Sequence, residues 1–295
     1  MSITFRETLY GGYAQTMPVD GPMLADERSR YQHIQIFDSR DNGRVLVLDG
    51  IIQLTDRDEC AYSEMLSHVP ILEHGRVRRA MIVGGGDGAI AEEILKHGDV
   101  EHVDLVDIDD RVIDLSRIHF AHVSGTAFAD PRLTVRAEDA FPFLAAEDAV
   151  GRYDLIVADR PDPVGPAEVL FAEAFYTAVS RALAPGGFAC FQTGVPFYQA
   201  EELSAALAQL RQSFAHVGTY LTVTPTYTGG FMALTWASND ARLGTIGAEE
   251  IAARAARKNL HTDYYTPAIH TACFALPRFV ERIIETGNAG LPKVG

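Results

Sequence analysis

The stretch Ala80-Met81-Ile82-Val83-Gly84-Gly85-Gly86-Asp87-Gly88-Ala89 decides the fold class of this chain. Its four apolar residues predict a buried strand, and the glycines that follow permit a tight turn into a helix. The stretch contains the pattern G-x-G-x-x-A, in which Gly84 and Gly86 let a ligand approach the backbone. About 20 residues further on, Asp107 ends the next predicted strand, where an acid typically binds ribose hydroxyls. The sequence therefore predicts a nucleoside site, and the glycine spacing suits an S-adenosyl ligand at least as well as a dinucleotide.

Strands and helices alternate on the C-terminal side of this stretch. Short apolar segments separated by amphipathic ones predict an α/β protein with a parallel sheet covered by helices on both faces. The predicted strands are residues 80–84, 102–107, 133–137, 153–159 and 188–192, and the predicted helices are residues 89–96, 110–118, 140–146 and 171–183. Further on, residues 221–227 and 231–237 flank Thr228-Gly229-Gly230 and predict a closing hairpin.

The first 55 or so residues have the pattern of antiparallel β structure. Residues 32–37, 44–48 and 51–54 predict strands, and the turn signals Asp41-Asn42-Gly43 and Asp49-Gly50 separate them. From Asp58 the apolar residues fall at helical spacing, which predicts a helix that ends at Pro70. We therefore expect a β-rich N-terminal domain at residues 1–70 and a larger domain at residues 71–295.

Composition limits the classes of function. Forty acidic residues against 25 basic ones give a net charge of −15, which disfavours nucleic acid as a partner and is also common in soluble enzymes. The three cysteines, Cys60, Cys190 and Cys273, are far apart and form no metal-binding or disulfide pattern, so we expect a cytoplasmic protein without a metal. The N-terminus lacks the apolar core of a secretory signal, and residues 217–239, although uncharged, are too polar for a membrane span.

Acidic residues follow two further predicted strands. Asp159 and Asp162 stand three residues apart in a proline-rich segment after strand 153–159, at the edge where open α/β sheets bind ligands. Such a corner can neutralise an ammonium and remove its proton, although a plain loop with a capping aspartate has the same pattern. Asp139 either contacts an adenine amine or caps the next helix. By spacing alone, Tyr62 and Tyr227 are more typical of packing residues than of ligand contacts.

Together these motifs resemble the spermidine synthases, which are polyamine aminopropyltransferases. The resemblance rests on Gly84–Gly88 with its following acid, D-x-x-DPxGPAE from Asp159, Asp56-Arg57-Asp58-Glu59, Pro225-Thr226-Tyr227 and the tail at 264–272. It implies a Rossmann-like, methyltransferase-type doubly wound sheet with a small N-terminal antiparallel β domain, assembled as a homodimer or homotetramer. It also implies decarboxylated S-adenosylmethionine as co-substrate, putrescine as acceptor, and neither a metal nor a permanently bound cofactor.

The resemblance assigns roles to individual residues. The nucleoside part of the donor, or of the product methylthioadenosine, would be bound by Gln32, Gly84, Gly86, Asp107, Asp139, Ala140 and Pro166. Gln53 and Asp87 would hold the aminopropyl amine of the donor. Asp159 would accept the proton, assisted by Tyr62. The polyamine site would be lined by Tyr62, Ser63, Asp87, Asp162 and Tyr227.

Five positions depart from the family pattern. Asp107 stands for Glu, Ala140 for Gly, Ser63 for His or Gln, and Arg160-Pro161 for two small polar residues. Arg160 either turns outward to pair with a carboxylate such as Glu168, or reaches the acceptor channel and repels the distal ammonium.

Three alternative functions stay open: aminopropyl transfer to another amine, N-methyl transfer from S-adenosylmethionine, and nucleoside binding without catalysis. Asp87 argues against methyl transfer, because related N-methyltransferases carry an apolar residue there. The pair Asp159 and Asp162 argues against loss of catalysis.

Overall fold

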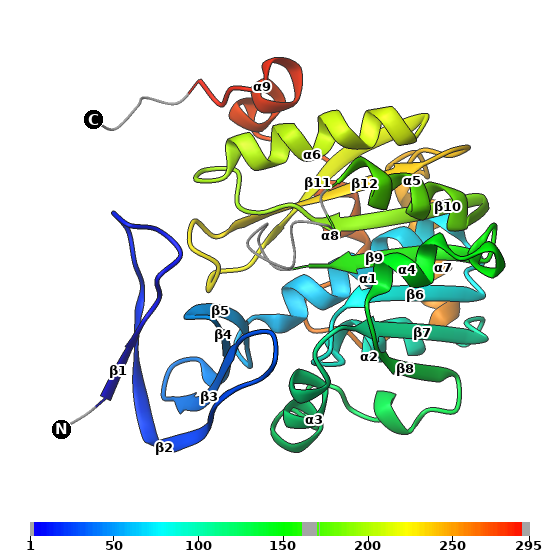
Figure 1. Ribbon diagram of the computed structural model, residues 1–295. Coiled ribbons are helices and arrows are strands. Elements are labelled where there is room, and N and C mark those ends of the chain that lie inside the picture. Colours follow the sequence, from blue (N-terminus) through cyan, green and yellow to red (C-terminus); the bar gives the residue numbers. More distant parts are fainter. Residues whose placement is uncertain (1–2, 161–169, 171, 291–295) are drawn as a thin grey trace.

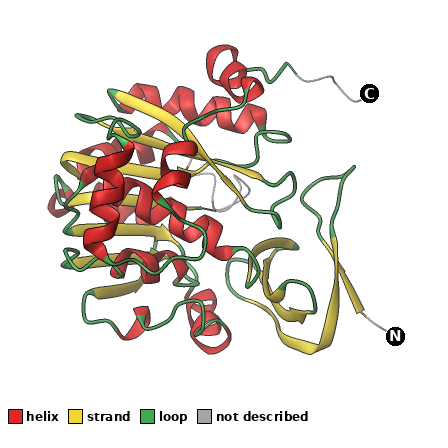
Figure 2. Ribbon diagram, turned by 180° about the vertical axis from the view of Figure 1, so that it is seen from behind, coloured by secondary structure: helices red, strands yellow, loops and turns green. Residues whose placement is uncertain are grey.

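The computed structural model describes residues 3–160, 170 and 172–290 of the chain. It contains two β-sheets that lie side by side, a small N-terminal sheet and a larger one between layers of helices (Figures 1 and 2). The expected α/β fold with an N-terminal antiparallel sheet is therefore confirmed.

The small sheet has five antiparallel strands in chain order. They are β1 (Ile3–Arg6), β2 (Thr16–Arg28), β3 (His33–Ser39), β4 (Gly43–Leu48) and β5 (Ile51–Thr55). Strands β3 to β5 are those that the alternating pattern predicted. Between β4 and β5, Asp49 and Gly50 both have positive φ, 49° and 80°, as the tightest hairpin turn requires. Strand β2 was not predicted, because its pairing register with β3 shifts between Asp20 and Ala25 and a shift breaks the alternation.

The large sheet places the two acidic motifs next to each other. Its order is β11-β12-β10-β9-β6-β7-β8, with β6 (Arg79–Gly84), β7 (His102–Asp107), β8 (Leu133–Ala137), β9 (Tyr153–Asp159), β10 (Leu183–Gln192), β11 (His216–Val223) and β12 (Phe231–Ser238). The strands from β10 to β8 are parallel, whereas β12 is antiparallel to both of its neighbours. The chain order reverses at β6 and β9, where Gly84 pairs with Asp159. Ligands of open α/β sheets bind at such a reversal.

Helices cover both faces of this sheet. They are α1 (Glu59–His74), α2 (Ala89–Leu95), α3 (Asp110–His119), α4 (Ala140–Ala145), α5 (Glu173–Ala182), α6 (Ala200–Ser213), α7 (Ala248–Lys258), α8 (Pro267–Ala272) and α9 (Arg278–Thr286). Alternate residues of β6 enter different cores: Ala80 and Ile82 pack with α1 and α2, whereas Met81 and Val83 pack with α4 and α5. This explains why the strand is apolar on both sides.

Helix α1 corrects one sequence prediction. It does not end at Pro70 but continues for one turn to His74. Ile71 and Leu72 of that turn are fully buried, which stabilises it despite the amide hydrogen that proline lacks. Gly75, with a left-handed φ of 84°, ends the helix by donating to the carbonyl of Ile71. The helix packs against the large sheet and α2, and the division of the chain at residue 70 remains a prediction.

Two further observations concern the environment of the protein. Within the described residues, no helix has the length and apolarity needed to cross a membrane. Cys60, Cys190 and Cys273 are all free thiols, of which the last two are buried.

Candidate active site

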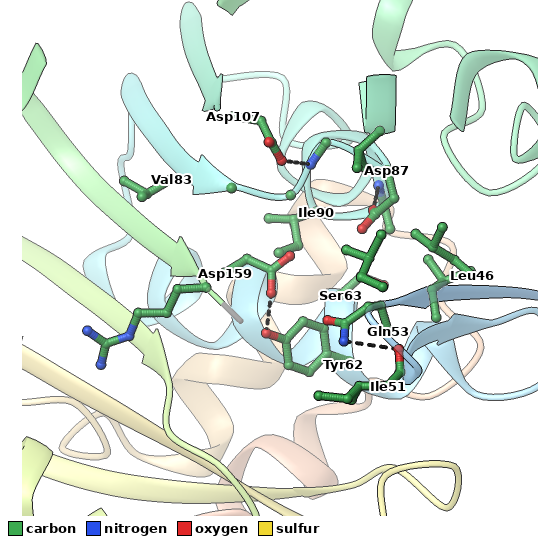
Figure 3. Close-up of a pocket in the computed structure, with 18 of the residues that line it drawn as sticks. Leu46, Ile51, Gln53, Tyr62, Ser63, Val83, Asp87, Ile90, Asp107 and Asp159 are labelled. Atoms are coloured by element: carbon green, nitrogen blue, oxygen red, sulfur yellow. Dashed lines mark hydrogen bonds between the residues drawn. The ribbon is translucent and has the colours of Figure 1, made fainter. Parts of the chain in front are cut away.

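A cavity of about 360 Å³ lies at the carboxyl edge of the large sheet, where the small sheet meets it (Figure 3). Its lining includes all described residues that the sequence analysis placed in the site: Gln32, Gln53, Tyr62, Ser63, Gly84, Gly86, Asp87, Asp107, Asp139, Ala140, Asp159 and Tyr227. The predictions for Asp162 and Pro166 concern positions outside the described residues.

The glycines after β6 are required by the packing as well as by any ligand. Gly84 has a φ of 78°, and a Cβ atom there would lie 1.9 Å from the carbonyl oxygen of Asp159. A Cβ atom at Gly86 would lie 2.7 Å from Oδ2 of Asp107. The strand-to-helix turn therefore fits against both neighbouring strands only when these positions have no side chain.

The backbone of this turn holds the acid at the end of β7. Asp107 accepts hydrogen bonds from the N–H groups of Gly86 at 3.0 Å and Asp109 at 2.9 Å. Burial raises the pKa of Asp107 to about 6 in spite of these bonds. Gln32 is held next to Asp107, because its Nε2 donates to Oδ2 of the neighbouring Asp109 at 2.9 Å. Both side chains therefore border the same cavity.

Asp139 has the second of its two expected roles, that of a helix cap. Its side chain accepts a hydrogen bond from the Phe141 N–H at 2.9 Å and caps α4. The capping interpretation is therefore confirmed. Since Asp139 also lines the cavity, contact with an adenine amine stays a prediction.

A second carboxylate, Asp87, enters the cavity from the N-terminal end of α2 (Figure 3). Its Oδ1 accepts a hydrogen bond from the Ala89 N–H at 2.8 Å. Burial raises the pKa of Asp87, which means that its ionised form gains from a cation bound nearby. Gln53 faces it from the small sheet, with its Nε2 held by the Ile51 carbonyl at 3.3 Å.

Asp159 and Tyr62 form a short hydrogen bond inside the cavity. The Tyr62 hydroxyl donates to Asp159 Oδ1 at 2.5 Å (Figure 3). Burial, and then the charge of Asp87, raise the pKa of Asp159 to about 7, although the bond from Tyr62 lowers it. A carboxylate with this pKa is a stronger base than an exposed aspartate. Its position at the end of β9 and its bond to a tyrosine equip it to accept a proton inside the cavity.

Tyr227 is brought to the site by the loop at residues 224–230. Its ring packs edge-on against Tyr62 with 5.8 Å between centroids, and its hydroxyl donates to the Gln53 carbonyl at 2.6 Å. Two buried acids hold the loop. Asp58 accepts bonds from the backbone and the hydroxyl of Thr226 at 2.7 and 2.6 Å, and Glu7 accepts one from Thr228 at 2.7 Å.

Sequence reasoning gave no role to Glu7, Asp58 or Glu59, although Asp58 and Glu59 stand in a motif that carries the family resemblance. Glu59 lines the cavity directly and accepts a hydrogen bond from the Ser63 hydroxyl at 2.9 Å. The available signal was the helical spacing of Glu59, Tyr62 and Ser63, which places all three on one face of α1.

Arg160 packs into the protein core. Its guanidinium lies 5.3 Å from the ring centroids of both Tyr176 and Phe191, and it donates to the Leu170 carbonyl. A planar guanidinium stacks well on aromatic faces, and only 2% of this residue is exposed. The expected outward turn of Arg160 is therefore wrong, because the guanidinium lies inside the protein over these two rings, and the residue also borders the cavity. The suggested partner Glu168 lies outside the described residues.

Comparisons with known proteins cover both sheets. Residues 59–245 match the family described as the spermine/spermidine synthase domain, and residues 3–56 match the spermidine synthase tetramerisation domain. A polyamine aminopropyltransferase of Ruegeria sp. (strain TM1040) is 41% identical over 94% of this chain and 96% of its own length. Polyamine aminopropyltransferase 1 of Pseudomonas aeruginosa is 42% identical over 95% of this chain and 97% of its own length.

Solved structures agree with these matches. The crystal structure of a spermidine synthase in complex with the transition-state analogue AdoDATO has a TM-score of 0.89 to this chain at 31% sequence identity. The superposition covers 96% of this chain and 95% of that one.

Proposed function

The chain belongs to the spermine/spermidine synthase family, and on this premise we propose that it transfers the aminopropyl group of decarboxylated S-adenosylmethionine to putrescine. The products are spermidine and methylthioadenosine. The observation that carries the proposal is that a nucleoside-type corner at Asp107 and a carboxylate–tyrosine pair at Asp159 open into one cavity.

The donor would be bound mainly along the ends of β6, β7 and β8. Asp107 and Gln32 would accept and donate hydrogen bonds at the ribose, and Asp139 and Ala140 would contact the adenine. Asp87 would pair with the aminopropyl ammonium. Ordinary S-adenosylmethionine carries an additional carboxylate beside that ammonium, and repulsion by Asp87 would disfavour it.

The acceptor reaches the cavity as a cation, since alkylamines have a pKa near 10, as lysine does. Asp159, oriented by Tyr62, removes one proton from the acceptor ammonium and so frees the nitrogen lone pair. The nitrogen forms a bond to the carbon of the aminopropyl group that is attached to the sulfonium sulfur. The carbon–sulfur bond breaks, its electron pair stays on sulfur, and neutral methylthioadenosine leaves. Holding both substrates in line contributes much of the remaining rate enhancement.

A product assay tests this proposal. The enzyme is incubated with decarboxylated or ordinary S-adenosylmethionine and a panel of diamines and triamines, and the products are identified by mass spectrometry. We expect spermidine and methylthioadenosine from putrescine with the decarboxylated donor only. Methylated amines from the ordinary donor, or preference for another amine, would overturn the donor or the acceptor assignment respectively. Methylthioadenosine binding without any product would indicate a non-catalytic nucleoside-binding module.

We also propose a homodimer or homotetramer, because the small sheet matches a domain described by tetramerisation. Sedimentation velocity measures the assembly directly. A cytoplasmic location stays a prediction from the sequence.

A further inference from the structure

Glu7 is a buried carboxylate that joins three segments of the chain. It directly follows β1, and only 3% of it is exposed. Its Oε1 accepts a hydrogen bond from the Ile52 N–H at 3.2 Å, and its Oε2 accepts bonds from the Thr228 hydroxyl at 2.7 Å and from Gln15 Nε2 at 3.0 Å. An ionised carboxylate accepts at both oxygens, whereas an amide of the same shape has one acceptor oxygen. The three donors therefore require an acid at this position.

The bond from Ile52 holds the small sheet in place next to the cavity. Strand β5 lies at the edge of that sheet, and its register with β4 shifts so that Gln53 is the extra residue of a β-bulge. A bulge turns a side chain out of the regular alternation, and Gln53 lines the cavity beside Tyr62 (Figure 3). By accepting the N–H of Ile52, Glu7 fixes the residue that directly precedes this bulge.

Tyr227 is held from two sides by these contacts. Its hydroxyl donates to the carbonyl of Gln53 at 2.6 Å, and Gln53 follows the residue that Glu7 binds. The next residue in the chain, Thr228, donates to Glu7 directly. These hydrogen bonds and the backbone between them form a closed ring that includes the Tyr227 side chain. The aromatic ring of Tyr227 packs edge-on against Tyr62, so the place of Tyr227 in the cavity depends on Glu7.

We propose that Glu7 is a positioning residue for the acceptor, because it fixes Tyr227 against Tyr62 beside the base Asp159; this inference rests on the proposed function. Glu7 lies behind the residues that line the cavity, so it acts through Tyr227 and not by touching a substrate. Its three bonds reach the acceptor side of the cavity. Loss of Glu7 should therefore weaken the use of putrescine and leave the binding of the nucleoside unchanged.

Steady-state kinetics at saturating decarboxylated donor and varied putrescine test the proposal. In Glu7→Gln we expect the KM for putrescine to rise about tenfold, the scale of one lost hydrogen bond to a charged group. The kcat should stay within about threefold, because the base is intact. Glu73→Gln is the matched control: Glu73 is 6% exposed and is bonded to the Thr245 N–H and to His270 Nε2 at the far end of α1. This control should keep the KM of wild type.

A double-mutant cycle separates positioning from a general loss of stability. Thr228→Val removes one bond of the ring, and Glu7→Gln is combined with it. If the bonds act as one unit, the KM of the double variant should equal that of Glu7→Gln within about twofold, whereas independent effects multiply. The Kd of methylthioadenosine, measured by calorimetry, should stay within about twofold of wild type in every variant, since the nucleoside side of the cavity is separate.

The outcomes separate this inference from the proposed function. A wild type that makes no spermidine from putrescine overturns both. With an active wild type, an unchanged KM in Glu7→Gln, an equal rise in Glu73→Gln, multiplied effects in the double variant or an equal loss of methylthioadenosine binding overturns the role of Glu7 alone. If Glu7→Gln does not fold, Glu7→Asp replaces it. The shorter carboxylate keeps the charge but does not reach both Ile52 and Thr228, so the same rise in KM is expected.

Discussion

The cavity has two walls that are built in different ways. The nucleoside wall consists of residues 84–89 with Asp107 and Asp139, and backbone amides hold its acids across sequence separations of 2 to 21 residues. The acceptor wall consists of Tyr62, Asp159 and the loop at residues 224–230. Its hydrogen bonds join groups 97 to 221 residues apart. The nucleoside wall is thus a property of local strand-to-helix turns, whereas the acceptor wall forms only when distant segments of the chain pack together.

This difference means that the two walls should respond separately to substitution. Changes in the acceptor wall should alter turnover or putrescine use and leave methylthioadenosine binding nearly intact. The four predictions below test that separation.

The largest effect is expected at Asp159. Asp159→Asn keeps the shape of the side chain and removes the base, so turnover should fall by about 100-fold or more. The Kd of methylthioadenosine should change little. Steady-state kinetics and calorimetry on the same preparation measure both quantities. Turnover close to that of wild type would remove Asp159 from the mechanism.

Loss of the Tyr62 hydroxyl should lower turnover less than loss of the Asp159 carboxylate does, and it should shift the pH profile of the rate. The wild-type rate should fall as the pH drops through about 7, because Asp159 must be ionised. The bond from Tyr62 lowers the pKa of Asp159, so in Tyr62→Phe this acidic limb should shift to higher pH. Turnover at neutral pH should decrease about tenfold. If the acidic limb of the kcat/KM profile stays at the same pH in Tyr62→Phe, a group other than Asp159 produces that limb.

The hydrogen bond from Thr228 to Glu7 anchors the loop at residues 224–230. Removing it tests whether the N-terminal region positions the acceptor wall. Thr228→Val removes the bond to the buried Glu7, which should cost about 1–3 kcal/mol of stability and raise the KM for putrescine a few-fold. Thr193→Val is the matched control, because it removes an equally buried bond to Thr235 away from the cavity. It should lower the melting temperature without changing that KM. If both variants change the KM equally, the loop anchor has no specific role.

The smallest kinetic effect is expected at the Arg160-Pro161 departure. Because the guanidinium lies over Tyr176 and Phe191, the double replacement by Ser-Ser should leave putrescine kinetics within about twofold of wild type. Thermal unfolding should show a loss of about 1–2 kcal/mol from the missing cation–π contacts. A sharp improvement in putrescine use would instead mean that Arg160 acts on the acceptor channel.

What the sequence determined by itself is mainly the nucleoside wall. The glycines at 84–88, Asp107 and the cap at Asp139 were predictable, because a turn, a strand end and a helix cap depend on residues a few positions apart. The strand before Asp159 also placed that acid at the ligand-binding edge of the sheet. The family resemblance gave Tyr62 and Tyr227 their functional roles, and the structure places all three residues on the cavity.

Only the tertiary structure decided the partners of these residues. The continuation of α1 past Pro70 depends on the burial of Ile71 and Leu72. The direction of Arg160 depends on rings of α5 and β10, which lie elsewhere in the sequence. Such contacts form when separate segments pack together, and no local pattern records them.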